Sequence, residues 1–123
     1  MLIKGFYTVL KTTVVDTVTI HVTIKLNKDH DVFNGHFPGN PITPGVCMIQ
    51  TIKEITQDHV NSSLFLQTIS NIKFTALINP NSNAELILEL SIIEDNNRVK
   101  LKNITKFTDG TIALKYNGTF IKN

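Results

Sequence analysis

The sequence predicts an α+β domain in which an antiparallel sheet wraps around one central helix. Most of the chain consists of segments rich in valine, isoleucine and threonine that are separated by short polar turns, as strands are. Only one segment carries the signals of a helix start, and it lies between two blocks of these strands. No repeat, linker or low-complexity segment interrupts the 123 residues, so one domain is expected over residues 1–123.

Six strands are expected, two before the helix and four after it. A turn at Asp16 separates the first two, and loops rich in asparagine, aspartate, proline and glycine separate the last four. The expected strands cover residues 7–15, 17–27, 64–76, 84–95, 98–107 and 112–121. A sheet therefore dominates the predicted fold.

The single helix is expected to run to about His59. Thr43 is placed as its N-cap, and Pro44 suits the first helical position. The opening turn, residues 46–49, is apolar around its whole circumference, whereas a surface helix shows a single apolar stripe. We therefore expect the start of the helix to be buried and its end to be polar. One buried helix embraced by an antiparallel sheet is the arrangement of the hot-dog fold.

Composition and charge exclude several classes of function. The 12 basic and 10 acidic residues leave a net charge of +2, which is too small to indicate nucleic-acid binding. No apolar stretch approaches the roughly 20 residues of a membrane span, and the N-terminus lacks the pattern of a signal peptide. The single cysteine, Cys47, rules out an internal disulfide and suits a reducing compartment. We expect a cytoplasmic protein that binds neither nucleic acid nor a membrane.

The most informative segment is residues 30–46, which contains three prolines and three glycines. These residues predict a rigid, irregular loop that leads into the N-terminus of the helix. That terminus offers free backbone N–H groups and a partial positive charge, and Gly45 would let a substrate oxygen approach them. His36 on such a loop could be a general base beside a developing oxyanion, or only a hydrogen-bonded residue of a turn. The residues alone leave both interpretations open.

Residues 35–46 read Gly-His-Phe-Pro-Gly-Asn-Pro-Ile-Thr-Pro-Gly-Val. This segment resembles the signature G-H-F-P-x-x-P-x-x-P-G-V of the FabZ/FabA-type 3-hydroxyacyl-acyl-carrier-protein dehydratases, and weaker similarity extends across most of the chain. The resemblance implies loss of water from a (3R)-hydroxyacyl thioester to give the trans-2-enoyl product, in fatty acid or aryl-polyene or flexirubin-type biosynthesis. It also implies acyl carrier protein as a partner, a homodimer or higher oligomer, and no cofactor beyond the carrier's phosphopantetheine arm.

The resemblance assigns roles to single residues as well. His36 would remove the Cα proton of the substrate, and the backbone N–H of Gly45 would bind the thioester carbonyl. The carbonyl of Ile42 would orient the histidine. The expected substrate-binding residues are Gly45, Val46, Ile42, Phe33 and Phe37. For the two phenylalanines, which could line an acyl tunnel, packing in the core is the competing explanation.

Position 50 departs from the family pattern, because the family has Glu or Asp there to help protonate the departing hydroxyl and this chain has Gln50. An amide can hydrogen-bond but cannot donate a proton and recover it. We expect Gln50 to be paired with backbone, water or substrate, since an unpaired buried amide costs about 1–3 kcal/mol. In the preferred route His36 returns its proton to the hydroxyl that Gln50 positions. In the second route Glu54, one helical turn further on, supplies the acid, although we expect it to be solvated.

Two alternative functions and one alternative kind of site are considered. Some hot-dog domains are acyl thioesterases, although the histidine motif is not their signature. The chain could instead be a catalytically weak subunit that binds acyl carrier protein or pairs with an active dehydratase. A metal site formed by His30, Asp31 and His36 lacks a clear further ligand, so no metal is expected.

Overall fold

The computed structural model describes residues 4–35 and 39–123. Two strands, β1 (Tyr7–Val14) and β2 (Thr19–Leu26), precede a short 3-10 turn, η1 (Asp31–Phe33), and the helix α1 (Gly45–Val60). Four strands follow the helix: β3 (Leu64–Phe74), β4 (Glu85–Asp95), β5 (Arg98–Phe107) and β6 (Ile112–Lys122). All six expected strands and the expected helix are present.

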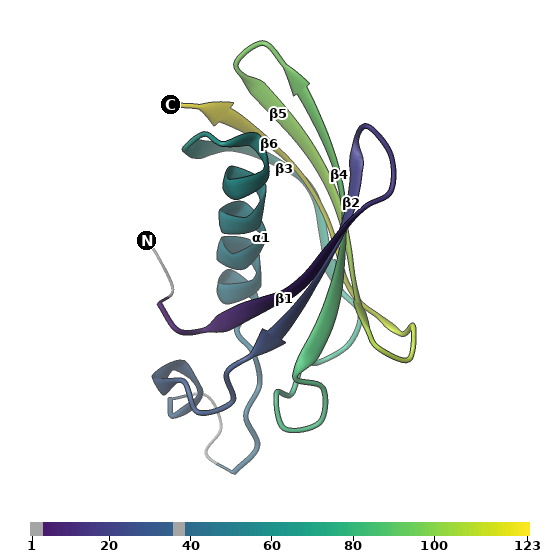
Figure 1. Cartoon of the computed structure of the whole chain (residues 1–123). Coiled ribbons are helices and arrows are strands. Elements are labelled where there is room, and N and C mark those ends of the chain that lie inside the picture. Colours follow the sequence, from purple (N-terminus) through teal and green to yellow (C-terminus); the bar gives the residue numbers. More distant parts are fainter. Residues whose placement is uncertain (1–3, 36–38) are drawn as a thin grey trace.

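The strands form one sheet in the order β1-β2-β4-β5-β6-β3, and every neighbouring pair is antiparallel. Figure 1 shows the sheet curving around α1, with β1 crossing the N-terminal half of the helix. The predicted hot-dog fold is therefore confirmed. β1 and β3 are the two edges of the sheet, and each leaves one side of its backbone unpaired within the described residues.

The core lies between the concave face of the sheet and one side of α1. Alternate residues of the central strands are buried, as the two-residue period of a strand requires when one face is covered. The side chains that meet there include Ile20, Val22 and Ile24 of β2, Leu86, Leu88 and Leu90 of β4, and Met48, Ile52 and Ile55 of α1. No helix in the described part of the chain is long and apolar enough to cross a membrane.

Three details of the prediction are wrong. Strand β2 begins at Thr19 rather than residue 17, because the Asp16 carboxylate accepts hydrogen bonds from the backbone N–H groups of Val18 and Thr19 and holds a turn there. Thr43 is not the N-cap: its backbone N–H pairs with the carbonyl of Ile78, and the cap is Pro44 without a side-chain hydrogen bond. Val46 is 74% exposed, so the first helical turn is not buried all round.

Candidate active site

The loop before the helix is anchored to the core by His30 and Phe33. The Nδ1 atom of His30 accepts a hydrogen bond from the backbone N–H of Val32, and its Nε2 atom lies 2.9 Å from the carbonyl oxygen of Lys4. Both ring nitrogens therefore serve the backbone rather than a metal ion. Phe33 is 5% exposed and stacks on Phe6, so packing in the core accounts for this side chain.

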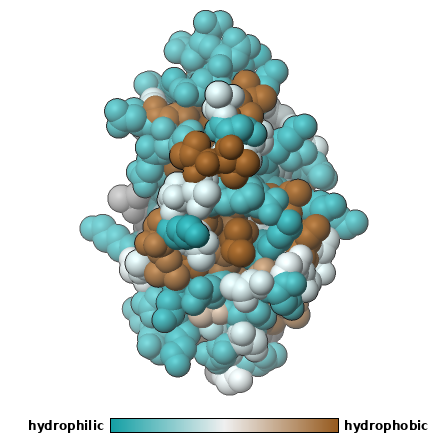
Figure 2. All heavy atoms as spheres, turned by 45° about the vertical axis from the view of Figure 1, so that its right-hand side comes forward, coloured by the Kyte–Doolittle hydropathy of each residue, from teal (hydrophilic) through white to brown (hydrophobic). Residues whose placement is uncertain are grey.

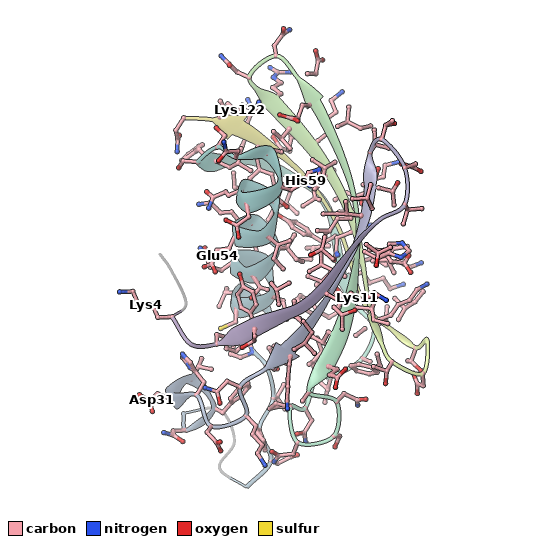
Figure 3. All side chains as sticks on the ribbon, viewed as in Figure 1. Lys4, Lys11, Asp31, Glu54, His59 and Lys122 are labelled. Carbon is pink, nitrogen blue, oxygen red and sulfur yellow. The ribbon has the colours of Figure 1, made fainter. Side chains whose placement is uncertain are left out.

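His36 and Phe37, the proposed base and one proposed tunnel residue, lie outside the described residues. Gly39, three residues after His36, has a φ of +83°, which side chains with a Cβ rarely adopt. This backbone conformation gives a physical reason for a glycine at this position of the loop. In Figure 3, Asp31 marks this loop below the N-terminal end of the helix.

A cavity of about 300 Å³ lies at the N-terminus of α1, where the sequence predicts substrate binding. Ile42 and Gly45, two of the predicted substrate-binding residues, both line it. A Cβ atom on Gly45 would lie 2.9 Å from Cζ of Phe74, so any larger residue at this position would force that aromatic ring to move. The cavity lining consists of Ile42, Thr43, Gly45, Phe74, Ala76, Leu77 and Ile78.

Sequence reasoning missed Phe74 and Leu77 as parts of this cavity. Both are large apolar residues that remain exposed, Phe74 by 45% and Leu77 by 72%. The signal that could have found them is the composition of β3, which carries apolar residues on both faces although it is an edge strand. Val46, in contrast, does not line the cavity; its side chain is exposed beside it.

Gln50 has the partner that its half-buried position requires, but the partner is a side chain that we did not anticipate. Its Nε2 atom donates a hydrogen bond of 3.0 Å to Oε2 of Glu54. The other carboxylate oxygen of Glu54 accepts a hydrogen bond of 3.0 Å from the hydroxyl of Tyr7 on β1. Glu54, midway along α1 in Figure 3, is half-buried, so the expectation that it is solvated is wrong.

Gly45 and Gln50 do not face the same way within one chain. Five helical positions separate them, which corresponds to roughly 140° around the helix axis. Gly45 lies against Phe74 near one edge of the sheet, whereas Gln50 lies beside Glu54 and Tyr7 of the opposite edge strand. The structure therefore does not bring all the predicted site residues together in a single protomer.

The Tyr7 hydroxyl gives the protein a predicted sensitivity to alkaline pH. Burial first, and then the negative charge of Glu54, raise the pKa of Tyr7 well above its ordinary value. Above about pH 10 the unfolded chain releases this proton while the folded state retains it, so the free energy of unfolding should fall as pH rises. Denaturant titrations between about pH 8 and about pH 11 should show a shallower fall in Tyr7→Phe than in the wild type.

The other tyrosine, Tyr116, is the same in both proteins and provides the common background for this comparison. Burial also raises the pKa of Tyr116, which lies in the core and contributes the same alkaline background to both proteins. Equal slopes for the wild type and Tyr7→Phe would contradict the prediction.

Two other features are less suited to chemistry at this site. Cys47 is 8% exposed and burial raises the pKa of its thiol, which describes a packing residue rather than a nucleophile.

A larger cavity, of about 380 Å³, lies between the first two strands and the C-terminal half of α1. Of the predicted site residues that the structure describes, none lines this cavity, so the cavity beside Gly45 remains the candidate.

Exposed apolar side chains follow the edge strand β3 and continue to the cavity. The set comprises Phe65, Ile69, Ile72 and Phe74 on β3 and Leu77 after it, all between 37% and 72% exposed. A second exposed set, Val9, Leu10, Val14 and Val15, lies on β1 and in the turn after it. In Figure 2, apolar surface lies in the middle of the face that is shown, and polar residues surround it. Of the two edges, only β3 contributes a residue to the cavity at Gly45.

Comparison of the sequence with known proteins finds dehydratases. Residues 12–113 match the family model described as ApeI-like, ApeI dehydratase. A 3-hydroxyacyl-[acyl-carrier-protein] dehydratase FabZ of Ligilactobacillus salivarius is 27% identical over 100 residues, which is 76% of this chain and 70% of the relative. Other FabZ relatives are matched over only 55% and 53% of their own length.

The solved structures that resemble this chain share its fold at low sequence identity. The dehydratase heterocomplex ApeI:P from Xenorhabdus doucetiae has a TM-score of 0.74 and 18% identity, with 94% of this chain and 97% of that chain covered. A hypothetical thioesterase from Streptococcus pneumoniae TIGR4, solved with coenzyme A, has a TM-score of 0.68 and 10% identity over 95% of this chain and 85% of that one. Because both enzyme classes appear among the neighbours, the fold alone does not choose the reaction.

Proposed function

This chain belongs to the ApeI-like dehydratase family, and from that premise we propose that it removes water from (3R)-hydroxyacyl thioesters to give trans-2-enoyl thioesters. The observation that carries the proposal is the cavity at the N-terminus of α1, which is lined by Ile42, Thr43 and Gly45 of the histidine motif. A helix N-terminus presents unpaired N–H groups and partial positive charge, which suit a thioester carbonyl that becomes enolate-like.

The proposed reaction needs one base and one oxyanion site. His36 takes the Cα proton of the substrate, and the electrons move onto the carbonyl oxygen, which accepts a hydrogen bond from the backbone N–H of Gly45. The enolate then re-forms its carbonyl while the bond from C3 to the hydroxyl breaks. The hydroxyl leaves as water after receiving the proton that His36 carried, so protons and electrons balance without an external acid.

Gln50 supports this route rather than one that uses Glu54 as the acid. Both carboxylate oxygens of Glu54 already accept hydrogen bonds, from Tyr7 and from Gln50. To act as the acid, Glu54 would have to give up one of these two hydrogen bonds before it could reach the substrate hydroxyl. We therefore assign proton transfer to His36 and positioning of the hydroxyl to Gln50.

We further propose that two copies of the chain assemble through β3. The edge of β3 is unpaired within the described residues, and Lys73 is the one charged residue on this strand, whereas many protected edges carry several. Since Gly45 and Gln50 diverge within one protomer, a partner at this edge would let one chain supply the histidine loop and the other supply helix residues. The related structure described as a dehydratase heterocomplex makes a different hot-dog subunit the alternative occupant of the same edge.

The substrate is proposed to arrive on the phosphopantetheine arm of acyl carrier protein, so that no separate cofactor is required. The pathway would be fatty acid biosynthesis or that of aryl-polyene or flexirubin-type pigments, in the cytoplasm. The FabZ relatives, which are 3-hydroxyacyl-[acyl-carrier-protein] dehydratases, support the choice of carrier.

The test is an assay on (3R)-hydroxyacyl carrier protein over several chain lengths, with mass spectrometry of the carrier and detection of released thiol. We expect loss of one water with the thioester intact. Release of free thiol without loss of water would instead establish a thioesterase. The wild type could also show no turnover, with activity appearing only in Gln50→Glu or in a mixture with a homologous dehydratase. The chain would then be a partner subunit, and the proposal would be wrong.

A further inference from the structure

We propose that Glu54 and Tyr7 are positioning residues that fix the orientation of the Gln50 amide, so that its carbonyl oxygen accepts a hydrogen bond from the 3-hydroxyl of the substrate. This inference rests on the proposed function, and it specifies that the substrate hydroxyl donates, and Gln50 accepts, the hydrogen bond at position 50. In relatives with a carboxylic acid there, that group gives a proton to the hydroxyl. Here the hydroxyl would donate to Gln50 and receive its second proton from His36.

The orientation follows from the chemistry of the groups that meet. An ionised carboxylate only accepts hydrogen bonds, so Gln50 must turn its NH₂ group towards Oε2 of Glu54, 3.0 Å away. The amide oxygen then lies at the other end of the amide group, directed away from Glu54. Without such a partner the two ends of an amide are nearly equivalent, and either could meet the substrate.

Tyr7 keeps Glu54 in this role. Its hydroxyl donates to Oε1 of Glu54 at 3.0 Å, from β1 and 47 residues away in sequence. Glu54 and Gln50 are four residues apart on α1, so their side chains lie on the same face of the helix. Because burial and the charge of Glu54 raise the pKa of Tyr7, the phenol remains a donor across the physiological range.

The experiment compares the binding of two thioesters that differ only in the hydroxyl, (3R)-hydroxybutyryl-pantetheine and butyryl-pantetheine. The proteins are the full-length wild type, Glu54→Gln and Tyr7→Phe. Glu54→Gln is isosteric but no longer dictates which end of the Gln50 amide faces it. We expect its preference for the hydroxylated ligand to fall about tenfold, the upper end for one neutral hydrogen bond. Tyr7→Phe keeps the ring and the carboxylate, so its loss should be smaller.

Matched controls separate positioning from general damage. Asp58→Asn makes the same carboxylate-to-amide change one turn further along α1 at an exposed position, and Tyr116→Phe removes a buried hydroxyl elsewhere. Both should retain the wild-type preference. Equal weakening of both ligands in Glu54→Gln and Tyr7→Phe, or an unchanged preference in both, would overturn the inference.

Turnover measured in parallel keeps this proposal distinct from the dehydratase proposal. A fall in kcat of Glu54→Gln, accompanied by the lost preference for the hydroxyl, supports both. The wild type could instead fail to dehydrate and still prefer the hydroxylated ligand, with that preference lost in Glu54→Gln. This result would contradict the proposed dehydration but support the positioning of Gln50 by Glu54.

Discussion

Replacement of His36 by alanine is expected to lower the rate of dehydration by about 10²–10⁴-fold, the contribution typical of a positioned general base. The Cα proton of a thioester is only weakly acidic, and none of the described side chains that line the cavity at Gly45 is a suitable base. Because the histidine acts on the reacting atoms and not on the pantetheine arm, KM should change little. The measurement is steady-state turnover of (3R)-hydroxyacyl carrier protein.

His59→Ala is the matched control for this prediction, because it removes an exposed imidazole near the C-terminal end of α1. Its turnover should equal that of the wild type. If His36→Ala retains most of its activity, then His36 is not the base. The interpretation of the motif residue as a hydrogen-bonded part of a turn would then be the better one.

A charge on the edge of β3 should separate the proposed dimer and remove activity with it. Ile69 is 42% exposed on this edge, and a lysine there would become a buried, unpaired charge in any assembly through β3. Loss of about 3–5 kcal/mol would weaken dimerisation by roughly two to three and a half orders of magnitude. Light scattering coupled to size-exclusion chromatography should show a dimer for the wild type and a monomer for Ile69→Lys at the same concentration.

Ile93→Lys supplies the control, since Ile93 is 47% exposed on β4, an interior strand of the sheet. It should remain dimeric and active. A wild type that is monomeric and fully active would refute the assembly through β3. Recovery of activity when Ile69→Lys is mixed with a homologous dehydratase would show that a different subunit can occupy the edge.

The sequence predicted the architecture because the elements obey local rules. Leu86, Leu88 and Leu90 are buried at alternate positions, and this two-residue period is a property of the strand itself. The helix follows the prolines and glycines of the loop, and it ends at Asn61 in a left-handed conformation that suits asparagine. The family of the chain was recognisable from the motif at residues 35–46 for the same reason, since the motif is continuous in the chain.

The tertiary structure decided the contacts that give the site its chemistry. The pairing of Tyr7 with Glu54 joins residues that are 47 positions apart, and it depends on how far β1 curves over α1. The approach of Phe74 to Gly45, and the exposure of Val46 within an apolar turn, likewise depend on which side of the helix meets β3. Periodicity shows which residues are apolar but not which element covers them. The sequence alone therefore determined the fold and a candidate base, and only the folded chain showed that Gln50 is held by Glu54.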